Sequence, residues 1–202
     1  MHSPQWTAPT SWTCRRLSSS ARTAILVEGT SDLVAIEALA DHRGIDLDAA
    51  GITLVPMGGA QAIGHFLDVF VPQGLRLAGL CDAAEESEFM RGLERAGLGS
   101  NLTRDGMEEI GFFVCVEDLE DELIRAHGAA AVEEVIEAEG DLGSFRTLQK
   151  QPAWQGRPVE EQLRRFMGSG GSRKIRYARR LVDALDPAKI PRPLDGVLAH
   201  VT

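Results

Sequence analysis

Three short apolar runs, each ending at a glycine pair or an acid, limit what this chain can fold into. The first is Arg22–Val27, followed by Glu28, the second is Ile52–Met57, followed by two glycines, and the third is Leu75–Cys81, followed by Asp82. In a strand, successive side chains point to opposite faces of the sheet. A run that is apolar at successive positions is therefore typical of a strand buried on both faces. Because amphipathic helical patterns fill the intervals, the sequence predicts an α/β fold with a mostly parallel sheet flanked by helices.

The pattern changes after about residue 123. Helices are expected between the apolar runs at 32–42, 62–70 and 85–96, and a fourth apolar run lies at 111–116. No further strand is expected in the later part. Helices are expected at 123–139, as one helix or two, and at 159–167, 173–185 and 194–201, with a short helix or turn at 144–150. We therefore predict a flexible N-terminal arm over 1–21, an α/β domain over 22–125 and a helical C-terminal extension over 126–202, with a mobile GSGGS loop at 168–172.

Charge and composition exclude several classes of protein. With 30 acids against 21 bases the formal net charge is −9, so any contact with nucleic acid must be local. The three cysteines include no CxxC pair, which argues against a structural zinc site and favours a reducing cytoplasm. No apolar run approaches the roughly 18 residues that a membrane span needs. Residues 1–21 lack the apolar segment of a secretory signal.

Two carboxylates lie close together where the first strand ends. Glu28 follows the strand directly, Gly29 permits a turn, and Asp32 comes four residues after the glutamate. Hard cations such as Mg²⁺ or Mn²⁺ prefer oxygen ligands of this kind. Taken alone, the pair has an alternative interpretation, in which Glu28 merely ends a strand and Asp32 caps a helix.

A third acid changes the balance between these interpretations. Asp82 follows another buried run, so it is expected at the same carboxyl edge of the sheet, where open α/β folds bind ligands. Acids at neighbouring strand ends repel each other unless a cation lies between them. The sequence therefore favours a divalent-cation site at this edge.

An ordered set of motifs resembles the Toprim domain. The set consists of VEGTSD at 27–32, LVPMGG at 54–59, the apolar strand before Asp82, and VEDLEDEL at 116–123. It is most similar to the Toprim domain of the OLD (overcoming lysogenisation defect) family of nucleases. The resemblance covers residues 22–125 and extends more weakly to Lys174. It implies a Toprim (Rossmann-like) fold.

The resemblance also implies roles for particular residues. It implies two Mg²⁺ or Mn²⁺ ions and a set of metal-binding acids, namely Glu28, Asp32, Asp82, Asp118 and Glu120. Glu28 would in addition act as a general base or acid. Lys174, which follows GSGGSR, would lie near the scissile phosphate and offset the charge that develops there.

This sequence departs from the Toprim pattern at one place. Toprim domains usually have Asp-x-Asp, whereas the residues here are Asp82, Ala83 and Ala84. Three interpretations stay open: a variant site with one acid, a site in which Glu85 is a substitute ligand, and a catalytically weak domain.

The late segment RKIRYARR, at 173–180, is basic. It predicts a helix that binds a phosphate backbone through Arg173, Lys174, Arg176 and Arg179. The alternative is an amphipathic helix with a solvated basic face and Ile175, Ala178, Leu181 and Val182 packed inward.

Three functions are compatible with these observations. The first is metal-dependent phosphodiester cleavage of nucleic acid, with DNA as the expected substrate. The second is a catalytically weak or inactive Toprim module that binds metal or nucleic acid and serves a partner protein. The third is a small α/β binding protein with fortuitous acids. Because no GxxxxGK[ST] motif occurs, we expect ATP hydrolysis only in a separate ATPase partner, and the chain itself to act alone or as a homodimer.

Overall fold

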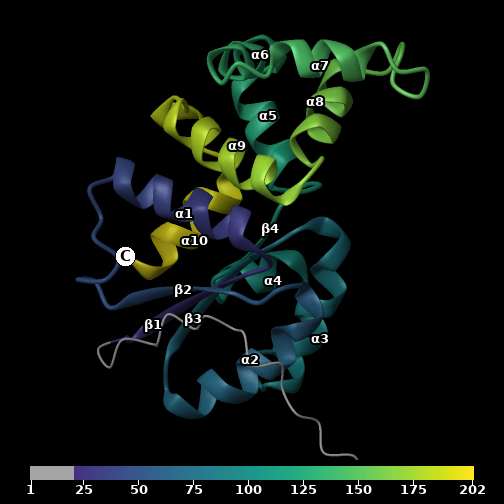
Figure 1. Cartoon of the computed structure of the whole chain (residues 1–202). Helices are drawn as coiled ribbons and strands as arrows, with labels where there is room; N and C mark the ends of the chain where they lie inside the picture. The colour runs from purple at the N-terminus through teal and green to yellow at the C-terminus, as the bar shows by residue number, and fades with distance from the viewer. Residues whose placement is uncertain (1–20) are drawn as a thin grey trace, which may run out of the picture.

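A four-stranded parallel sheet forms the centre of the protein (Figure 1). The computed structural model describes residues 21–202, so the prediction of a flexible arm falls almost entirely outside the described residues. The strands are β1 (Thr23–Val27), β2 (Ile52–Pro56), β3 (Arg76–Cys81) and β4 (Phe112–Val114). They lie in the order β2-β1-β3-β4, and every pair is parallel. The predicted fold class is confirmed.

Helices follow each of the four strands. Between the strands lie α1 (Thr30–His42), α2 (Ile63–Phe70), α3 (Glu86–Arg95) and α4 (Arg104–Glu109), with 3₁₀ turns η1 (Ala60–Ala62), η2 (Val71–Gln73) and η3 (Ala83–Glu85). After β4 come α5 (Leu119–His127), α6 (Ala129–Ala138), α7 (Leu142–Gln149), α8 (Val159–Met167), α9 (Gly171–Asp183), η4 (Pro187–Lys189) and α10 (Arg192–Val201). Within residues 21–202, none of these helices has the length and apolar character to cross a membrane.

The two faces of the sheet bury different sets of side chains. Along β1, Ala24 and Leu26 contribute to one apolar cluster, while Ile25 and Val27 contribute to the other. The first cluster is covered by α2, α3 and α4, and the second by α1 and α10 (Figure 1). Alternation of this kind gives three layers with the sheet in the middle.

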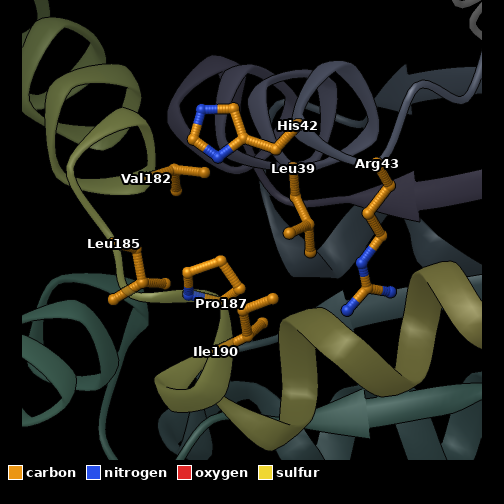
Figure 2. Close-up of a pocket in the computed structure, with 7 residues that line it drawn as sticks. All are labelled: Leu39, His42, Arg43, Val182, Leu185, Pro187 and Ile190. Atoms are coloured by element: carbon orange, nitrogen blue, oxygen red, sulfur yellow. The ribbon is translucent and has the colours of Figure 1, made fainter.

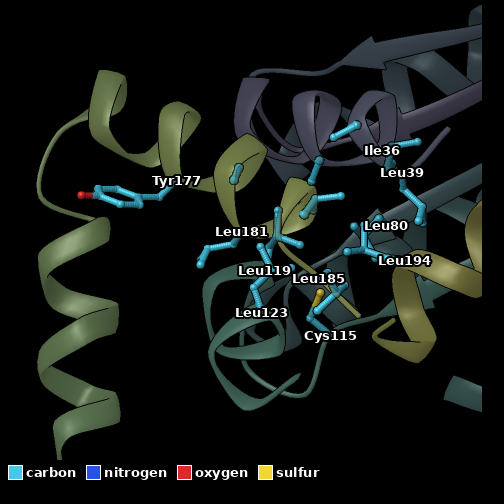
Figure 3. Packing of buried hydrophobic residues seen from close by; sticks show 14 of the residues in the cluster. Ile36, Leu39, Leu80, Cys115, Leu119, Leu123, Tyr177, Leu181, Leu185 and Leu194 are labelled. Atoms are coloured by element: carbon cyan, nitrogen blue, oxygen red, sulfur yellow. The ribbon is translucent and has the colours of Figure 1, made fainter. Parts of the chain in front are cut away.

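The helical part after β4 shares its core with the sheet. Figure 3 shows Leu80 of β3, Leu119 of α5 and Leu181 of α9 in one group of buried side chains. Helix α9 packs along α1, and α5 through α8 pack on one another above it (Figure 1). The apolar cluster therefore runs without interruption across residue 125, where we predicted a domain boundary; that boundary stays a prediction.

The last helix returns to the sheet. Helix α10 lies against β3 and β4, beside α1, although it belongs to the segment predicted as an extension. The approach to β4 is close at Gly196, where an added Cβ atom would lie 2.7 Å from two atoms of the buried Phe113 ring. A side chain at this position would therefore require the ring or the helix to move.

The remaining differences from the predicted elements are local. The segment predicted as one helix or two is divided into α5 and α6 at Gly128, whose φ is 78°. Two residues of the predicted GSGGS loop, Gly171 and Ser172, already belong to α9. Helix α4 was not predicted, because it is only six residues long and carries Gly106 in its middle.

Replacement of two helical glycines should have opposite effects. We expect Gly196→Ala to destabilise the protein by about 1–3 kcal/mol, because the added methyl group overpacks the contact with Phe113. Gly143→Ala in α7, where no atom lies within 4 Å of an added Cβ, should stabilise it by about 0.5–1 kcal/mol. Urea unfolding followed by circular dichroism measures both changes. Equal effects of the two substitutions would contradict the close packing of α10.

Candidate functional site at the carboxyl edge of the sheet

Glu28 and Asp82 meet at the carboxyl ends of the two central strands. Strands β1 and β3 pair in parallel, with Val27 opposite Leu80, so the residues that follow them emerge side by side. The backbone N–H of Asp82 donates a hydrogen bond of 3.1 Å to Oε1 of Glu28. The fold thus joins two acids that lie 54 residues apart in the sequence.

The backbone of Glu28 is fixed by the loop that follows β2. The N–H groups of Gly58 and Gly59 both donate to the Glu28 carbonyl, at 2.9 and 3.1 Å. Both glycines have positive φ, of 79° and 131°, which other residues adopt at a cost. These two amides therefore serve to position Glu28.

Asp32 is held at the start of α1. Its carboxylate accepts the Gly29 N–H at 2.9 Å, and its side chain belongs to the first turn of the helix. The residue is only 8% exposed. Asp32 therefore contributes to the capping of α1, as the alternative interpretation expected. The same contact places its carboxylate near the strand ends.

The missing second acid of the Asp-x-Asp pattern falls on a 3₁₀ turn. Ala84 is exposed in η3, whereas Glu85, at the end of that turn, is half-buried. The charge of Glu85 contributes to raising the pKa of Glu28, so the two carboxylates are electrostatic neighbours. This electrostatic influence is consistent with a substitute role for Glu85, which stays a prediction.

The acids of the DLE segment are tied to basic side chains. Asp118 caps α5 by accepting the Asp121 N–H at 2.8 Å, and its other oxygen accepts Nε of Arg164 at 2.6 Å. Glu120 lies 3.2 Å from Nζ of Lys174, measured from its Oε2. The structure therefore brings Lys174, from the start of α9, to the acids predicted as metal ligands.

Burial and mutual repulsion raise the pKa values of the acids at this edge. Burial, followed by the charges of Glu28 and Asp32, raises the pKa of Asp82 to about 8. Burial is also the largest cause that raises the pKa of Glu28, of Asp32 and of Glu120. A cluster whose charged form is disfavoured in this way gains from a bound cation.

The positive charge of Lys174 acts on all four of these acids and lowers the pKa of each. Burial alone would lower the pKa of Lys174 itself, but the negative charge of Glu120, with those of Asp32 and Asp82, holds the pKa above its ordinary value. The ammonium group is thus charged at neutral pH and shares its field among several carboxylates.

The residues of this edge fit a hard divalent cation in their chemistry. All the candidate donors are carboxylate oxygens, which Mg²⁺ and Mn²⁺ prefer. Oε1 of Glu120, a residue only 6% exposed, is a buried oxygen without a hydrogen-bond partner. As the side chains stand, no three His, Cys, Asp or Glu residues among those described lie close enough together to hold an ion.

The basic helix α9 is compensated by acids of the same chain. Arg176 pairs with Asp141 and, at 3.7 Å, with Glu139, and Arg173 lies 3.9 Å from Asp141. Arg179 is 3.0 Å from both Asp41 and Asp183, and Arg180 is 2.8 Å from Glu139. The amphipathic alternative expected Ile175, Ala178, Leu181 and Val182 to pack inward. The last three are buried, but Tyr177 is buried as well and Ile175 is only half-buried. The nucleic-acid role of Arg173, Lys174, Arg176 and Arg179 stays a prediction.

Two cavities lie outside the carboxylate cluster. One, of about 180 Å³, is lined by Leu39, His42, Arg43, Val182, Leu185, Pro187 and Ile190 (Figure 2). This lining contains no acid and lies at the C-terminal end of α1, away from the strand ends that carry Glu28 and Asp82. The other, of about 280 Å³, lies beside the start of α9 and is lined by Ser169, Ser172, Arg173 and Arg176.

Sequence reasoning missed the roles of Arg164 and Asp141. Arg164 lies 46 residues after its partner Asp118, and Asp141 accepts hydrogen bonds from Arg176 and from the Tyr177 hydroxyl, 35 and 36 residues further along the chain. The sequence carries no local signal for such pairs, because they depend on how α7, α8 and α9 pack. Cys81 and Cys115 are both buried free thiols.

The first part of the chain matches a known family. Residues 21–83 match the family model described as the TOPRIM domain of overcoming lysogenization defect protein-like proteins. The chain carries an OLD-like Toprim domain, which confirms the resemblance.

Solved structures extend the similarity beyond this segment. The C-terminal region of the Xanthomonas campestris pv. campestris OLD protein is 25% identical, with a TM-score of 0.65 over 90% of this chain and 94% of that one. The C-terminal region of the Burkholderia pseudomallei OLD protein shares the fold at 24% identity, with a TM-score of 0.63 over 90% of this chain and 99% of that one. No curated protein matches the sequence.

The raised pKa of Asp82 predicts a pH-dependent cost to stability. An ordinary aspartate has a pKa of about 3.9, so folding favours the protonated form, and this contribution is lost as the pH rises toward about 8. In EDTA, Asp82→Asn should therefore raise the melting temperature more at pH 9 than at pH 5, by about 2–4 °C for each kcal/mol relieved. Asp68→Asn, at an exposed acid of α2, should show no such difference. If Asp82→Asn raised the melting temperature equally at pH 5 and pH 9, the raised pKa of Asp82 would be refuted.

Proposed function

We propose that this protein is a divalent-metal-dependent nuclease that cleaves phosphodiester bonds in nucleic acid, with DNA as the expected substrate. The observation that carries the proposal is the group of acids at the carboxyl edge of the sheet in an OLD-like Toprim domain, with Asp32 buried and Glu28 and Asp82 half-buried. Structure alone gives no reason to bury acids together, because their repulsion and desolvation oppose folding.

Mg²⁺ or Mn²⁺ is the cofactor that this donor set would take. We assign Glu28, Asp32 and Asp82 as the residues that would hold it, with Glu85 as the substitute for the acid missing at Ala84. When bound, such an ion supplies Lewis-acid stabilisation of phosphoryl oxygens and lowers the pKa of a water nucleophile.

The side chains of the protein supply the remaining parts of the chemistry. The raised pKa of Glu28 makes this carboxylate a better proton acceptor near neutral pH, as a general base requires. The ammonium group of Lys174 stays charged and would offset negative charge on the phosphate under attack. The hydrogen bond from the Asp82 N–H holds Glu28 in one orientation.

Contact with nucleic acid would be confined to the surface around α9. Arg173 and Arg176 line the cavity of about 280 Å³ beside the start of this helix. A phosphate backbone there would compete with Asp141 for both guanidinium groups. We propose Arg173, Lys174, Arg176 and Arg179 as the contacts, and we propose a separate ATPase chain and a homodimer as the partners.

One observation favours a second function. Ala84 stands where Toprim domains usually carry an acid, which would suit a catalytically weak or inactive module that binds metal or nucleic acid for a partner protein. The two functions differ in whether the purified chain turns over.

Cleavage assays distinguish the two functions. Plasmid and single-stranded DNA are incubated with the protein in Mg²⁺, Mn²⁺ or Ca²⁺. We expect cleavage with Mg²⁺ or Mn²⁺ and a loss of about 100-fold or more in Glu28→Gln and in Asp82→Asn. Asp68→Asn, at an exposed acid of α2, serves as the matched control and should cleave normally.

Two results would contradict the proposal. If both Glu28→Gln and Asp82→Asn still nick plasmid DNA, the active site does not lie at these acids. If the unmodified protein cleaves neither these DNA substrates nor single-stranded RNA added as a third substrate, and Mn²⁺ binding is intact, the non-catalytic module would be the function.

A further inference from the structure

The cavity beside the start of α9 is lined only by hydroxyl and guanidinium groups. Its volume is about 280 Å³, and its lining consists of Ser169, Ser172, Arg173 and Arg176. Among the residues that the structure describes, no carboxylate lines this cavity, although Asp141 pairs with both arginines. Hydroxyl and guanidinium groups offer hydrogen-bond donors and positive charge, so the cavity fits an anion.

Aromatic rings and a hydroxyl group hold both guanidinium groups in position. The guanidinium carbon of Arg173 lies 4.3 Å from the centre of the Phe166 ring, and its Nη1 donates to Oγ of Ser169 at 2.6 Å. The guanidinium carbon of Arg176 lies 5.2 Å from the centre of the Tyr177 ring. Contact with a ring leaves the N–H donors along the edge of a guanidinium group open to an anion. Both groups are therefore oriented before a ligand binds, which lowers the entropy that binding costs.

Most donors of these two guanidinium groups are not used by the protein. An arginine side chain carries five N–H donors. Within residues 21–202, the guanidinium of Arg173 donates a hydrogen bond to Ser169 alone, and that of Arg176 donates to Asp141 alone. Ser172, which is exposed, adds a hydroxyl group to the lining. The cavity can therefore supply several hydrogen bonds to one ligand.

The positive charge at this cavity is only partly compensated. Arg173 and Arg176 share the carboxylate of Asp141, and Arg176 shares that of Glu139 with Arg180. Three guanidinium groups thus face two carboxylates, which leaves one positive charge. The contact between Arg173 and Asp141 is also long, at 3.9 Å. An anion can therefore bind here in addition to the carboxylates or in place of Asp141.

The two kinds of phosphate in nucleic acid differ in what they offer such a site. An internal phosphodiester carries one negative charge, as does the Asp141 carboxylate with which it would compete. A phosphate monoester at the end of a strand carries a charge of about −1.5 to −2 at pH 7 and has three acceptor oxygens. The monoester is therefore the stronger partner for two guanidinium groups.

We propose that the cavity at the start of α9 binds a phosphate monoester, supplied by the end of a nucleic-acid strand. The inference rests on the proposed function for the source of this phosphate, because a nuclease meets strand ends as substrates and as products. It narrows the contact between α9 and nucleic acid, since Arg173 and Arg176 are assigned to one terminal phosphate. Lys174, the next residue after Arg173, contacts Glu120, so a strand held by its end lies close to the carboxylate cluster.

Binding of short single-stranded DNA in EDTA tests the proposal without cleavage. Fluorescence anisotropy of the full chain compares three oligonucleotides of one sequence, which carry a 5′-phosphate, a 3′-phosphate or hydroxyl groups at both ends. We expect at least one phosphorylated form to bind about 10-fold more tightly than the hydroxyl form, because the terminal phosphate makes new charge-assisted hydrogen bonds. Equal Kd values for the three forms would overturn the inference.

Variants locate this preference for a phosphorylated end. In Arg173→Gln and in Arg176→Gln the preference should fall to about 2-fold or less. Arg165→Gln, at an exposed arginine of α8 for which the described residues show no ion pair, removes the same charge and should keep the preference. A preference that survives in both cavity variants would overturn the location. Circular dichroism verifies that each variant is folded. If neither cavity variant folds, Ser172→Ala decides, because it should reduce the preference by about 3-fold.

A competitor identifies the source of the phosphate, and the cleavage assay separates the possible failures. If inorganic phosphate displaces the labelled strand as effectively as the unlabelled phosphorylated oligonucleotide does, the monoester site stands and its assignment to a strand end is overturned. Absence of any end preference in a protein that cleaves DNA would overturn the inference alone. If a chain that does not cleave keeps the end preference, the inference stands and the proposed nuclease function fails.

Discussion

The ion pair between Lys174 and Glu120 links the two parts of this protein. The carboxyl edge of the sheet gathers acids whose burial opposes their ionisation, and the ammonium group that relieves them comes from α9, more than 140 residues after Glu28 in the sequence. Helix α9 can deliver this charge because it packs along α1, the helix that begins at the same strand end. The helical part is thus required for the electrostatics of the sheet edge as well as for its cover.

Compensation by residues of the same chain also explains how an acidic protein carries a basic helix. The guanidinium groups of α9 are paired with Asp41, Glu139, Asp141 and Asp183. Most of these contacts are exposed, and ion pairs of that kind contribute little to stability individually. Their effect is to fix the direction of each side chain. A ligand that binds there must therefore be a stronger partner for arginine than a surface carboxylate is.

Much of the fold was predictable because the signals were local. The strand before Glu28 and the helix at 159–167 follow directly from apolar runs and helical periodicity, and the structure places them within a residue or two of the predicted bounds. The proximity of Glu28 to Asp82 was also predictable, since parallel strands deliver their carboxyl ends to one edge. The partner of Asp118 was not, because the pairing with Arg164 depends on how α8 packs against α5. The burial of Tyr177 was missed for a related reason: its hydroxyl reaches Asp141, a partner that the periodicity of α9 does not reveal.

Glu28 is held at two separate points, and this has a consequence for how such a site can vary among proteins. Its main chain is anchored by Gly58 and Gly59 after β2, while its side chain is anchored by the amide that follows β3. All of these anchors are backbone groups, which every residue except proline can supply. The side chains of the loop after β3 are therefore free to change, as Ala83 and Ala84 illustrate, without displacing the glutamate. The glycine pair has no such freedom, so the orientation of this carboxylate depends on main-chain geometry and tolerates sequence drift around it.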